Sequence, residues 1–549
     1  MPTESSFTTV DIPNVDLWGF MFERKDRGFS DDQVIYRSCD NSSRKYTWVE
    51  VREAATAFGK GLRNLWDWNK GDVLAVYAPN DIDFAPVVYG TFYAGGIVTP
   101  ANPAYSANEL EFQLSNSEAK ALVTTKDFLP NAAKAAEKAG IPNDRIILIG
   151  EQRDEAHKYK HWSNIRPTSG AVRYRRRKMD PDGDLAFLAY SSGTTGLPKG
   201  VMLSHRNIIS DVLLINGAVG KWYSGGKDKI LGVLPFFHIY GLTGLVHQPL
   251  HRGLEVVVMP AFNLEVFLKA IQEHKITFIY VAPPVIVRLA RDEIVDKYDI
   301  RSVKMITCGA APLTKELVDS VHKRTNIKIN QAYGLSETSP MTHTQPWDEW
   351  YDSVGSVGKM FPNMKAKYIS PEGRELGPGE TGELWLSGPN IFKGYWKNEA
   401  ATKEAMSEDG YFKTGDVGYQ DKHENFYITD RVKELIKYKG FQVAPAELEG
   451  KLMDHPSVND VAVIGVQDEE MHTEVPRAYV VPAKGKNSEK DAKEIVDWVS
   501  GQVASHKRLR GGVRFIDEVP KSASGKILRR VLKDKAKQEE KQSGKKAKI

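Results

Sequence analysis

Short apolar runs alternate with amphipathic segments through the N-terminal part of the chain. Between residues 46 and 65, apolar side chains recur every three or four positions, which is typical of a helix with one buried face. The runs 73–77 and 121–124 are continuously apolar or nearly so, as in buried strands, while 107–115 again has helical spacing. This alternation predicts doubly wound α/β layers.

Four further strands are expected, and each leads into a loop of small or polar residues. The expected strands are 185–190, 230–234, 305–307 and 327–331. Ligands of open α/β sheets bind beyond the carboxyl ends of the strands. The four loops should therefore meet at one crevice.

The pattern changes toward the C-terminus. Frequent Gly and Pro between short alternating runs in 362–396 predict a small barrel-like β region. An α+β module is then expected, with strands at 460–466, 477–481 and 513–516 and a helix at 489–503. We expect an N-terminal domain at 1–432, a small mobile C-terminal domain at 433–532, and a charged, flexible tail without an apolar face at 533–549.

Composition narrows the function classes. A chain of 549 residues exceeds the size of one hydrophobic core, and its net charge of +4 indicates neither nucleic acid nor an anionic membrane as a partner. Cys39 and Cys308 are the only cysteines, which excludes a disulfide framework or a metal–thiolate cluster. Residues 1–16 lack a secretory pattern, and the most apolar stretch, 84–98, is too short and too interrupted to span a bilayer. We expect no stable membrane insertion.

The strand at 185–190 leads into the loop Ser191-Ser-Gly-Thr-Thr-Gly-Leu-Pro-Lys-Gly200. Glycines allow a polyphosphate to approach the backbone, hydroxyls add donors, and a lysine supplies positive charge. Lys199 is followed by Gly200 and not by the Ser or Thr of the common P-loop, so another class of nucleotide enzyme is indicated. The alternative is a plain surface turn. The residues predicted to bind phosphate are Ser191, Ser192, Gly193, Thr194, Thr195 and Lys199.

This loop resembles the signature of the adenylate-forming superfamily, which includes acyl-CoA synthetases, 4-coumarate:CoA ligases, luciferases and adenylation domains of peptide synthetases. Matching motifs extend from about Tyr46 to Arg530, and the resemblance is closest to 4-coumarate:CoA ligase-like acyl-CoA ligases of the peroxisomal type. The other motifs are Gln331-Ala-Tyr-Gly-Leu-Ser-Glu337, Thr414-Gly-Asp416, Asp430-Arg431, the segment 433–449, and Pro520-Lys-Ser-Ala-Ser-Gly-Lys526.

The resemblance implies a two-step ligation that uses ATP, Mg²⁺ and CoA. A carboxylate attacks the α-phosphate of ATP to give acyl-AMP and pyrophosphate, and the CoA thiol then displaces AMP. Lys526 would contact the carboxylate and the α-phosphate, and Glu337 would bind magnesium. Asp416 would bind the ribose, Arg431 would add a ribose or phosphate contact, and Tyr333 would stack on adenine. The AMP site would be completed by Gly309, Ala310, Ala311, Gln331, Ala332, Gly334 and Ser336.

The same resemblance implies that the C-terminal domain rotates about Lys433 and presents a second face to the CoA arm. That face would carry Lys437, Lys439, Gly440 and Gln442. His238 would orient the acyl carboxylate or gate the site, although a buried structural histidine is the alternative. A mostly uncharged pocket suited to aryl or medium-chain acids is expected, lined by Tyr240, Thr243, Val281, Ala310, Pro340 and Met341.

The sequence departs from plant coumarate ligases near both substrates. Ala261 stands where those enzymes carry a CoA-contacting lysine, and Thr243 and Thr307 stand where several use Asn or Lys around the phenolic ring. A luciferase-like oxygenase is one rival function, although Ile239-Tyr240-Gly241 matches ligases. A carrier-loading module or an inactive binding protein is another, although no carrier segment follows and every catalytic position is retained.

The last three residues, Ala547-Lys548-Ile549, resemble a peroxisomal targeting tripeptide of the small-basic-aliphatic kind. The expected partner is therefore the peroxisomal import receptor. The expected localisation is the peroxisome, or the cytoplasm if the tripeptide is not read.

Overall fold

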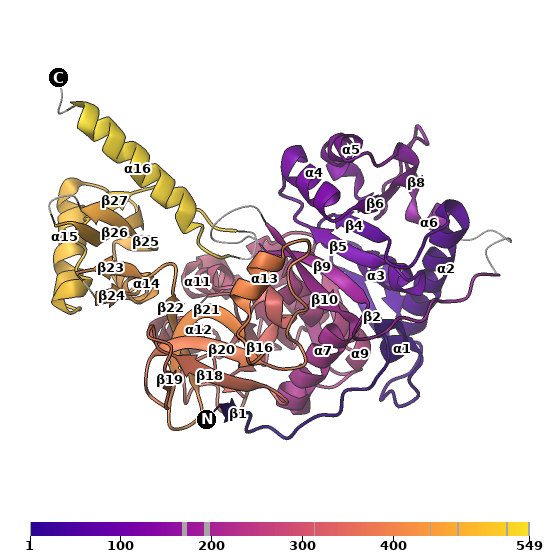
Figure 1. Ribbon diagram of the computed structural model, residues 1–549, viewed down its shortest axis with the longest axis horizontal. Coiled ribbons are helices and arrows are strands. Elements are labelled where there is room, and N and C mark those ends of the chain that lie inside the picture. The colour runs from indigo at the N-terminus through magenta and orange to yellow at the C-terminus, as the bar shows by residue number, and fades with distance from the viewer. Residues whose placement is uncertain are drawn as a thin grey trace.

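The computed structural model describes residues 2–166, 173–191, 198–311, 313–439, 441–468, 471–522 and 525–546, with side chains as far as residue 539. Three sheets with their covering helices occupy the larger part of the molecule, and a smaller α+β body follows them in the chain (Figure 1). The predicted fold class, a large α/β part with a β-rich region followed by a small α+β part, is confirmed.

A seven-stranded sheet forms the first layer. Its strands are parallel except β10, which returns antiparallel to β9. In spatial order they are β10 (Lys199–Ser204), β9 (Leu185–Ser191), β5 (Ile97–Ala101), β4 (Val73–Tyr77), β6 (Ala119–Thr124), β7 (Ile146–Leu148) and β8 (Lys160–His161). Its accompanying helices are α2 (Trp48–Trp66), α3 (Phe84–Tyr93), α4 (Ala107–Asn116), α5 (Leu129–Lys138) and α6 (Trp162–Ile165).

Helix α2 shows how the sequence pattern becomes structure. Thr47 caps its first turn by accepting from the Glu50 amide, and the Glu50 carboxylate accepts from the Thr47 amide in return. This reciprocal capping satisfies amide donors that have no partner within the helix. The apolar stripe that predicted the helix is buried from Trp48 to Leu62, whereas Leu65 at its end is exposed, and α2 packs against α3.

A nine-stranded sheet forms the second layer and carries most of the predicted loops. In spatial order its strands are β17 (Lys359–Met360), β16 (Met341–Thr344), β15 (Lys328–Gly334), β14 (Met305–Cys308), β13 (Phe278–Val281), β11 (Lys229–Gly232), β12 (Glu255–Val258), β2 (Val34–Ser38) and β3 (Lys45–Thr47). The six strands from β15 to β2 are parallel, so their carboxyl ends share one edge. Helices of this part are α1 (Leu17–Phe22), α7 (His205–Val219), α8 (Ile239–Gly241), α9 (Gln248–Arg252), α10 (Leu264–His274), α11 (Pro283–Arg291) and α12 (Lys315–Thr325).

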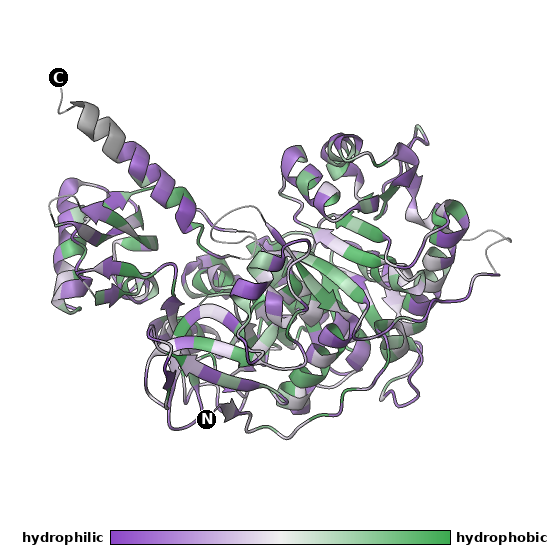
Figure 2. Cartoon of the chain, viewed as in Figure 1, coloured by the Kyte–Doolittle hydropathy of each residue, from purple (hydrophilic) through white to green (hydrophobic). Residues whose placement is uncertain are grey.

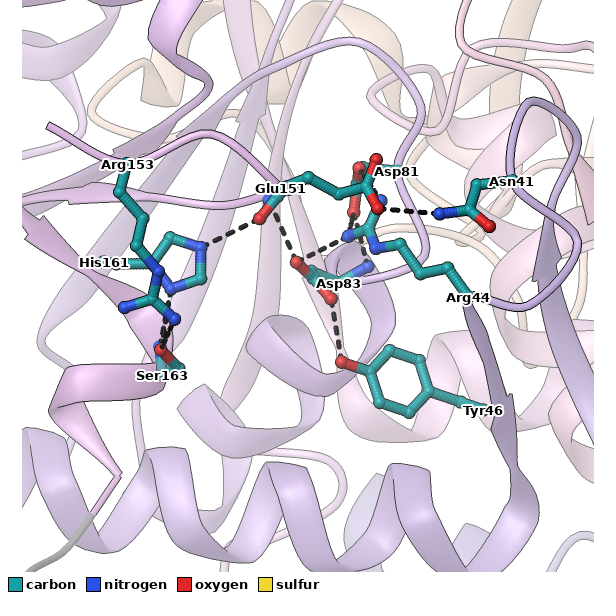
Figure 3. Close-up of polar contacts among 10 residues, drawn as sticks. Asn41, Arg44, Tyr46, Asp81, Asp83, Glu151, Arg153, His161 and Ser163 are labelled. Atoms are coloured by element: carbon teal, nitrogen blue, oxygen red, sulfur yellow. Dashed lines mark hydrogen bonds and ion pairs between the residues drawn. The ribbon is translucent and has the colours of Figure 1, made fainter.

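A polar network joins the two large sheets (Figure 3). The guanidinium of Arg44, just before β3, donates to both carboxylate oxygens of Asp81 at 2.6 and 2.7 Å and also pairs with Asp83, both of which follow β4. Tyr46 and the Gly150 amide donate to Asp83 at 2.9 Å each. Burial raises the pKa of Asp83 to about 6. The network fixes one sheet against the other.

The third sheet is antiparallel and corresponds to the predicted barrel-like region. Its strands are β1 (Thr3–Glu4), β18 (Lys365–Ile369), β19 (Glu375–Leu376), β20 (Gly382–Ser387), β21 (Phe412–Gln420) and β22 (Phe426–Arg431), and helix α13 (Glu399–Ala405) lies between β20 and β21 in the chain. Buried and half-buried residues alternate strictly along β21, as expected where one face packs on the core.

The C-terminal part has a hydrophobic core of its own, drawn from residues 436 to 536. Its elements are β23 (Ile436–Tyr438), β24 (Phe441–Val443), α14 (Pro445–Met453), β25 (Val458–Asp468), β26 (Thr473–Pro482), α15 (Glu489–Ser500), β27 (Val513–Phe515) and α16 (Arg529–Lys546). Arg529, at the start of α16, pairs with Glu434 and with Glu449 of α14 at 2.6 Å each. These pairs tie the segment around residue 529 to both α14 and the segment after β22.

The structure differs from the sequence prediction at several element boundaries and in the tail. The helix predicted at 489–503 ends at Ser500, and β15 continues through Gly334, three residues beyond the predicted strand, because it pairs there with β16. The prediction of a tail without an apolar face is wrong: residues as far as 546 are helical, and Ala536 is buried in the C-terminal core. Leu532 and Ala536 are four residues apart, so α16 buries them together.

Hydropathy agrees with this division into layers. Hydrophobic residues concentrate on the strands and on the inner faces of the helices, while α16 is largely hydrophilic where it is coloured (Figure 2). Among the described residues, no helix combines the length and the apolar character that a membrane span requires.

Candidate active site

Strands β9 and β10 hold the two ends of the predicted phosphate loop. Ser191 lies opposite Lys199 and Tyr190 lies opposite Gly200 in the antiparallel register. Both ends are therefore fixed by the seven-stranded sheet. Four residues predicted to bind phosphate lie outside the described residues: Ser192, Gly193, Thr194 and Thr195.

Lys199 and Glu337 meet at a common neighbour, Tyr395. The Lys199 Nζ lies 4.8 Å from the centroid of the Tyr395 ring, and the Tyr395 hydroxyl donates to Glu337 Oε1 at 2.8 Å. Glu337 is 9% exposed and lies in the turn directly after β15. Burial, together with the Glu337 charge, raises the pKa of Tyr395 above its ordinary value, so the hydroxyl stays protonated and acts as the donor.

Asp416 is held between Arg431 and Tyr333. Pairing of β21 with β22 sets Asp416 opposite Arg431, whose Nε lies 3.0 Å from Asp416 Oδ1. The Tyr333 hydroxyl donates to Oδ2 at 2.6 Å. The Asp416 charge raises the pKa of Arg431, and burial with the same charge raises that of Tyr333. The structure thus brings the three predicted ribose and adenine residues together at the edge of the third sheet.

The segments after β14 and β15 lie side by side next to Tyr333. A Cβ on Gly309 would lie 3.1 Å from the Tyr240 ring and 3.4 Å from the Ala332 carbonyl oxygen. A Cβ on Gly334 would lie 2.0 Å from the Pro340 carbonyl oxygen, so no side chain fits there.

The segments after β14 and β15 also contain a strained backbone position and a buried side-chain amide. Ala310 has a φ of +76°, a left-handed conformation that costs a non-glycine residue about 1–3 kcal/mol and is concentrated at functional sites. The Gln331 side chain accepts from the Leu313 amide at 2.9 Å and so ties the segment after β14 to β15. Two further residues predicted to line the AMP site lie in the same segments: Ala311 follows Ala310, and Ser336 lies two residues after Gly334.

Lys526 reaches this crevice from the C-terminal part. A Cβ on its neighbour Gly525 would lie 3.2 Å from Ala282 and Pro284, so the Lys526 loop rests against the start of α11. Burial and the nearby Arg431 charge lower the pKa of Lys526 to about 8. Lys526 therefore remains mostly protonated at pH 7.

His238 follows strand β11 in the chain and lies near the Lys526 ammonium. Its Nδ1 accepts from the Tyr240 amide at 3.3 Å. Burial and the Lys526 charge lower the pKa of His238 to about 4, so its imidazole is neutral at pH 7. A neutral imidazole beside the Lys526 ammonium, which itself lies near Arg431, suits a site that brings a carboxylate to a phosphate.

Four of the predicted acyl-pocket residues lie together. Tyr240 and Thr243 are three positions apart in consecutive helical segments, the Thr243 hydroxyl donates to the Ser339 carbonyl at 2.8 Å, and Pro340 and Met341 directly follow Ser339. Val281 is not part of this group, because it packs into the core on the opposite face of the nine-stranded sheet.

Tyr280, the residue before Val281, points to the pocket side instead. Its ring centroid lies 5.7 Å from that of Tyr240, and its hydroxyl donates to Gln248 at 2.8 Å. Alternation along β13 was the signal that could have separated the two residues.

The hairpin β23–β24 carries the predicted CoA-facing residues away from this crevice. Lys437 lies opposite Gln442, and the side chains of both, like that of Lys439, are exposed. Amides of Lys437 and Lys439 donate to Glu474 and Thr473 of β26. Gly440 lies outside the described residues, and Lys433, the predicted pivot, is exposed between β22 and β23.

The donor set fits a nucleotide-bound Mg²⁺. The described residues contain no group of three or more His, Cys, Asp or Glu side chains able to hold a metal. Mg²⁺ on nucleotides typically takes one or two protein carboxylates and completes its shell with phosphate and water oxygens. Glu337 provides one such carboxylate, and it shares its neighbour Tyr395 with Lys199 at the end of the predicted phosphate loop.

Known protein families match the larger N-terminal part and the C-terminal part of this chain separately. A family described as AMP-binding enzyme matches residues 22–396, and its C-terminal domain matches residues 447–526. The chain belongs to the AMP-binding enzyme family. The predicted membership of the adenylate-forming superfamily, near the 4-coumarate:CoA ligases, is thereby confirmed.

Individual relatives extend over nearly the whole chain. A probable 4-coumarate–CoA ligase 1 of Dictyostelium discoideum is 40% identical over 89% of this chain and 90% of its own. The peroxisomal OPC-8:0-CoA ligase 1 of Arabidopsis thaliana is 36% identical over 95% of this chain and 93% of its own. The crystal structure of ATP-bound MatB from Rhodopseudomonas palustris matches with a TM-score of 0.83 at 27% identity, over 95% of this chain and 99% of that one.

Sequence reasoning missed Tyr395. It lies in the segment Phe392-Lys-Gly-Tyr-Trp396, which was assigned only to the β-rich region. An aromatic residue in a Gly-rich stretch carries no distinctive spacing, and its link to Glu337 spans 58 positions in the chain.

Proposed function

We propose that this protein is an ATP-dependent carboxylic acid:CoA ligase, which forms an acyl-AMP and then an acyl-CoA thioester. The observation that carries the proposal is the convergence of Lys526 with His238, Arg431 and Asp416 in one crevice, although they come from four separate segments. Membership of the AMP-binding enzyme family and relatives named as CoA ligases support it.

In the first half-reaction the acid and ATP meet beside Lys526. Negative charge accumulates on the α-phosphate as the carboxylate attacks, and the Lys526 ammonium stabilises it. Asp416 accepts from the ribose hydroxyls, and Tyr333 stacks on adenine, so the nucleotide is oriented for in-line attack. Glu337 would hold Mg²⁺, which when bound would supply positive charge to neutralise the phosphates.

The second half-reaction uses the other face of the C-terminal part. Lys437, Lys439, Gly440 and Gln442 line the path of the CoA arm once the part following Lys433 has rotated. In the orientation described, the hairpin is exposed and Lys526 is in the crevice, which supports adenylation as the step this orientation serves. The rotation requires a boundary between the two domains, which we place between residues 432 and 433.

The acyl pocket favours aryl or medium-chain acids. The lining proposed for it is Tyr240, Thr243, Tyr280, Pro340 and Met341, all uncharged. A second carboxylate buried without a partner costs several kcal/mol, so dicarboxylates are poor substrates. The names of the relatives, a 4-coumarate ligase and an OPC-8:0 ligase, accord with such acids.

The test is the stoichiometry of ATP use with a panel of acids. Purified protein should release AMP and pyrophosphate only when an acid is present, and should consume CoA thiol only after that. Cinnamate, coumarate, phenylacetate and hexanoate should exceed succinate and adipate. Release of ADP and phosphate would refute the ligase assignment, and faster turnover of succinate or adipate would refute the pocket.

The C-terminal tripeptide Ala547-Lys548-Ile549 assigns the protein to the peroxisome in this proposal. The tripeptide lies outside the described residues, and the support is its sequence together with the name of the Arabidopsis relative. A fluorescent protein fused ahead of the full chain should colocalise with a peroxisomal marker and become cytosolic when the three residues are removed. Cytosolic signal from the intact fusion would contradict the assignment.

A further inference from the structure

The position of Tyr395 is fixed by backbone pairing with the strand that leaves the phosphate loop. Val201 of β10 bridges Tyr395, and the amides of Met202 and Trp396 donate to the Gly394 and Gly200 carbonyls at 2.9 and 2.8 Å. The Tyr395 amide donates to the Thr402 hydroxyl at 2.9 Å. The segment thus extends the sheet beside β10 and holds the Tyr395 ring next to Lys199.

The Tyr395 side chain separates two opposite charges. Lys199 Nζ lies over the ring face, and Glu337 accepts from the hydroxyl at the ring edge. Within the described residues Lys199 forms no ion pair, and no hydrogen bond to a side chain uses Glu337 Oε2.

We propose that Tyr395 is a positioning residue of the nucleotide site: its hydroxyl orients the Glu337 carboxylate toward the metal, and its ring holds Lys199 toward the phosphates. The proposal rests on the function proposed above and adds a residue to its site. The hydroxyl occupies Oε1 and leaves Oε2 for Mg²⁺. The cation–π contact holds the Lys199 ammonium without neutralising its charge.

A purely structural tyrosine would behave differently. Buried tyrosine hydroxyls usually find a partner, and removal of one then lowers only stability. Tyr46 offers a chemically matched comparison, because its hydroxyl donates to the Asp83 carboxylate at 2.9 Å in the network that joins the two large sheets (Figure 3). A structural role predicts the same behaviour for Tyr395→Phe and Tyr46→Phe.

The experiment measures nucleotide binding as a function of free Mg²⁺. Binding of the non-hydrolysable analogue α,β-methylene-ATP is titrated by calorimetry in the wild type, Tyr395→Phe and Tyr46→Phe, with melting temperature as the check on folding. In Tyr395→Phe the Mg²⁺ concentration for half-maximal enhancement should rise about tenfold or more, the scale of one lost hydrogen bond to a charged group. Tyr46→Phe should keep the wild-type Mg²⁺ response even if its melting temperature falls. An unchanged Mg²⁺ response in folded Tyr395→Phe would overturn the proposal.

A second pair of variants tests whether Tyr395 acts through Glu337 and Lys199. In a Glu337→Gln background, adding Tyr395→Phe should change the Mg²⁺ response less than twofold, and a full additive effect would overturn the assignment. Tyr395→Leu, which also removes the ring, should weaken binding of the analogue in EDTA, and unchanged binding there would refute the Lys199 part. These measurements need no acid or CoA, so a failure of the ligase assignment, seen as absence of pyrophosphate release by the wild type, is recognised separately.

Discussion

At the scale of single residues, the site is a set of charged side chains, each held in place by a neighbouring side chain. Lys526 and Arg431 bring positive charge from the two parts of the chain, and Asp416 and Glu337 are each held by a tyrosine hydroxyl. Fixed donors and charges need little reorganisation when charge develops on the substrate, which is why such sites accelerate reactions. The protonation state of Lys526 then sets the pH range of the first half-reaction.

We expect adenylation to decline above pH 8. The pKa of Lys526 is lowered to about 8 mainly by burial, so the side chain is charged below that pH and neutral above it. The kcat/KM for ATP, followed by pyrophosphate release, should therefore fall on the alkaline side with an apparent pKa near 8. Lys526→Arg should remove this limb, and Lys526→Ala should reduce the rate by about 10²–10³-fold at pH 7.

The control for this titration is Lys521, in the same loop but paired with Asp460. Lys521→Arg should retain the alkaline limb of the wild type. An alkaline limb that persists in Lys526→Arg would show that another group titrates.

A second expectation concerns the hydrogen bond from Tyr333 to Asp416. Tyr333→Phe keeps the ring for stacking but leaves Asp416 without its donor at 2.6 Å. The Kd of α,β-methylene-ATP should rise about 10-fold, the effect of losing a hydrogen bond to a charged group, with no change in Mg²⁺ dependence. Tyr298→Phe, which loses a hydrogen bond to Glu265 on the surface, should bind as the wild type does. Equal affinity of Tyr333→Phe and the wild type would mean that the bond does not orient Asp416.

At the scale of elements, the sequence pattern was sufficient to predict helices and strands wherever buried positions recur at regular intervals. The amphipathic spacing of α2 and the continuous apolar runs of β4 and β6 are direct consequences of packing one face or both faces. Resemblance to the family's motifs, and not periodicity, pointed to Asp416, Arg431 and Lys526. Pairing between distant segments could not be read in this way, so the continuation of β15 against β16 and the position of Tyr395 beside β10 were missed.

Helix α16 was missed for a related reason. Two buried residues, Leu532 and Ala536, are too few to produce a visible amphipathic period among many charged neighbours, yet Lys, Glu, Gln and Ala all favour helix once the first turn is anchored. Arg529, paired with Glu434 and Glu449, provides that anchor.

The anchoring of α16 can be tested with adjacent substitutions. Leu532 is 2% exposed and Val531 is 49% exposed. Leu532→Ala should destabilise the C-terminal part by about 2–5 kcal/mol, whereas Val531→Ala should change it by about 0.5 kcal/mol or less. Hydrogen exchange of amides in α14 and β25 would report the difference locally. Equal protection in both variants would mean that α16 does not contribute to that core.

At the scale of the whole molecule, the arrangement of the two parts decides which residues reach the crevice. In this arrangement Lys526 is next to His238, and the exposed hairpin β23–β24 lies elsewhere on the C-terminal part (Figure 1). Among the described residues, polar contacts join the parts, such as the Arg291 guanidinium donating to the Asn459 carbonyl and the Ala446 amide donating to the Asp430 carboxylate, both at 3.0 Å. An interface of this kind permits rotation at the connecting segment.

A reversible cross-link across this interface should separate the two half-reactions. A Cβ on Gly450 of α14 would lie 3.4 Å from the Thr314 Cγ2 at the start of α12, so cysteines at the two positions come within the range of a disulfide. The native thiols should not compete, because burial raises the pKa of Cys39 to about 11 and raises that of Cys308 as well. The oxidised Thr314→Cys/Gly450→Cys variant should still release pyrophosphate and form acyl-AMP, since Lys526 stays in the crevice, but should form acyl-CoA from supplied acyl-AMP at least about tenfold more slowly. Reduction should restore the thioester step, and each single-cysteine variant under the same oxidation should perform both steps. If the cross-linked protein carried out both half-reactions at the rates of the reduced form, rotation of the C-terminal part would not be required.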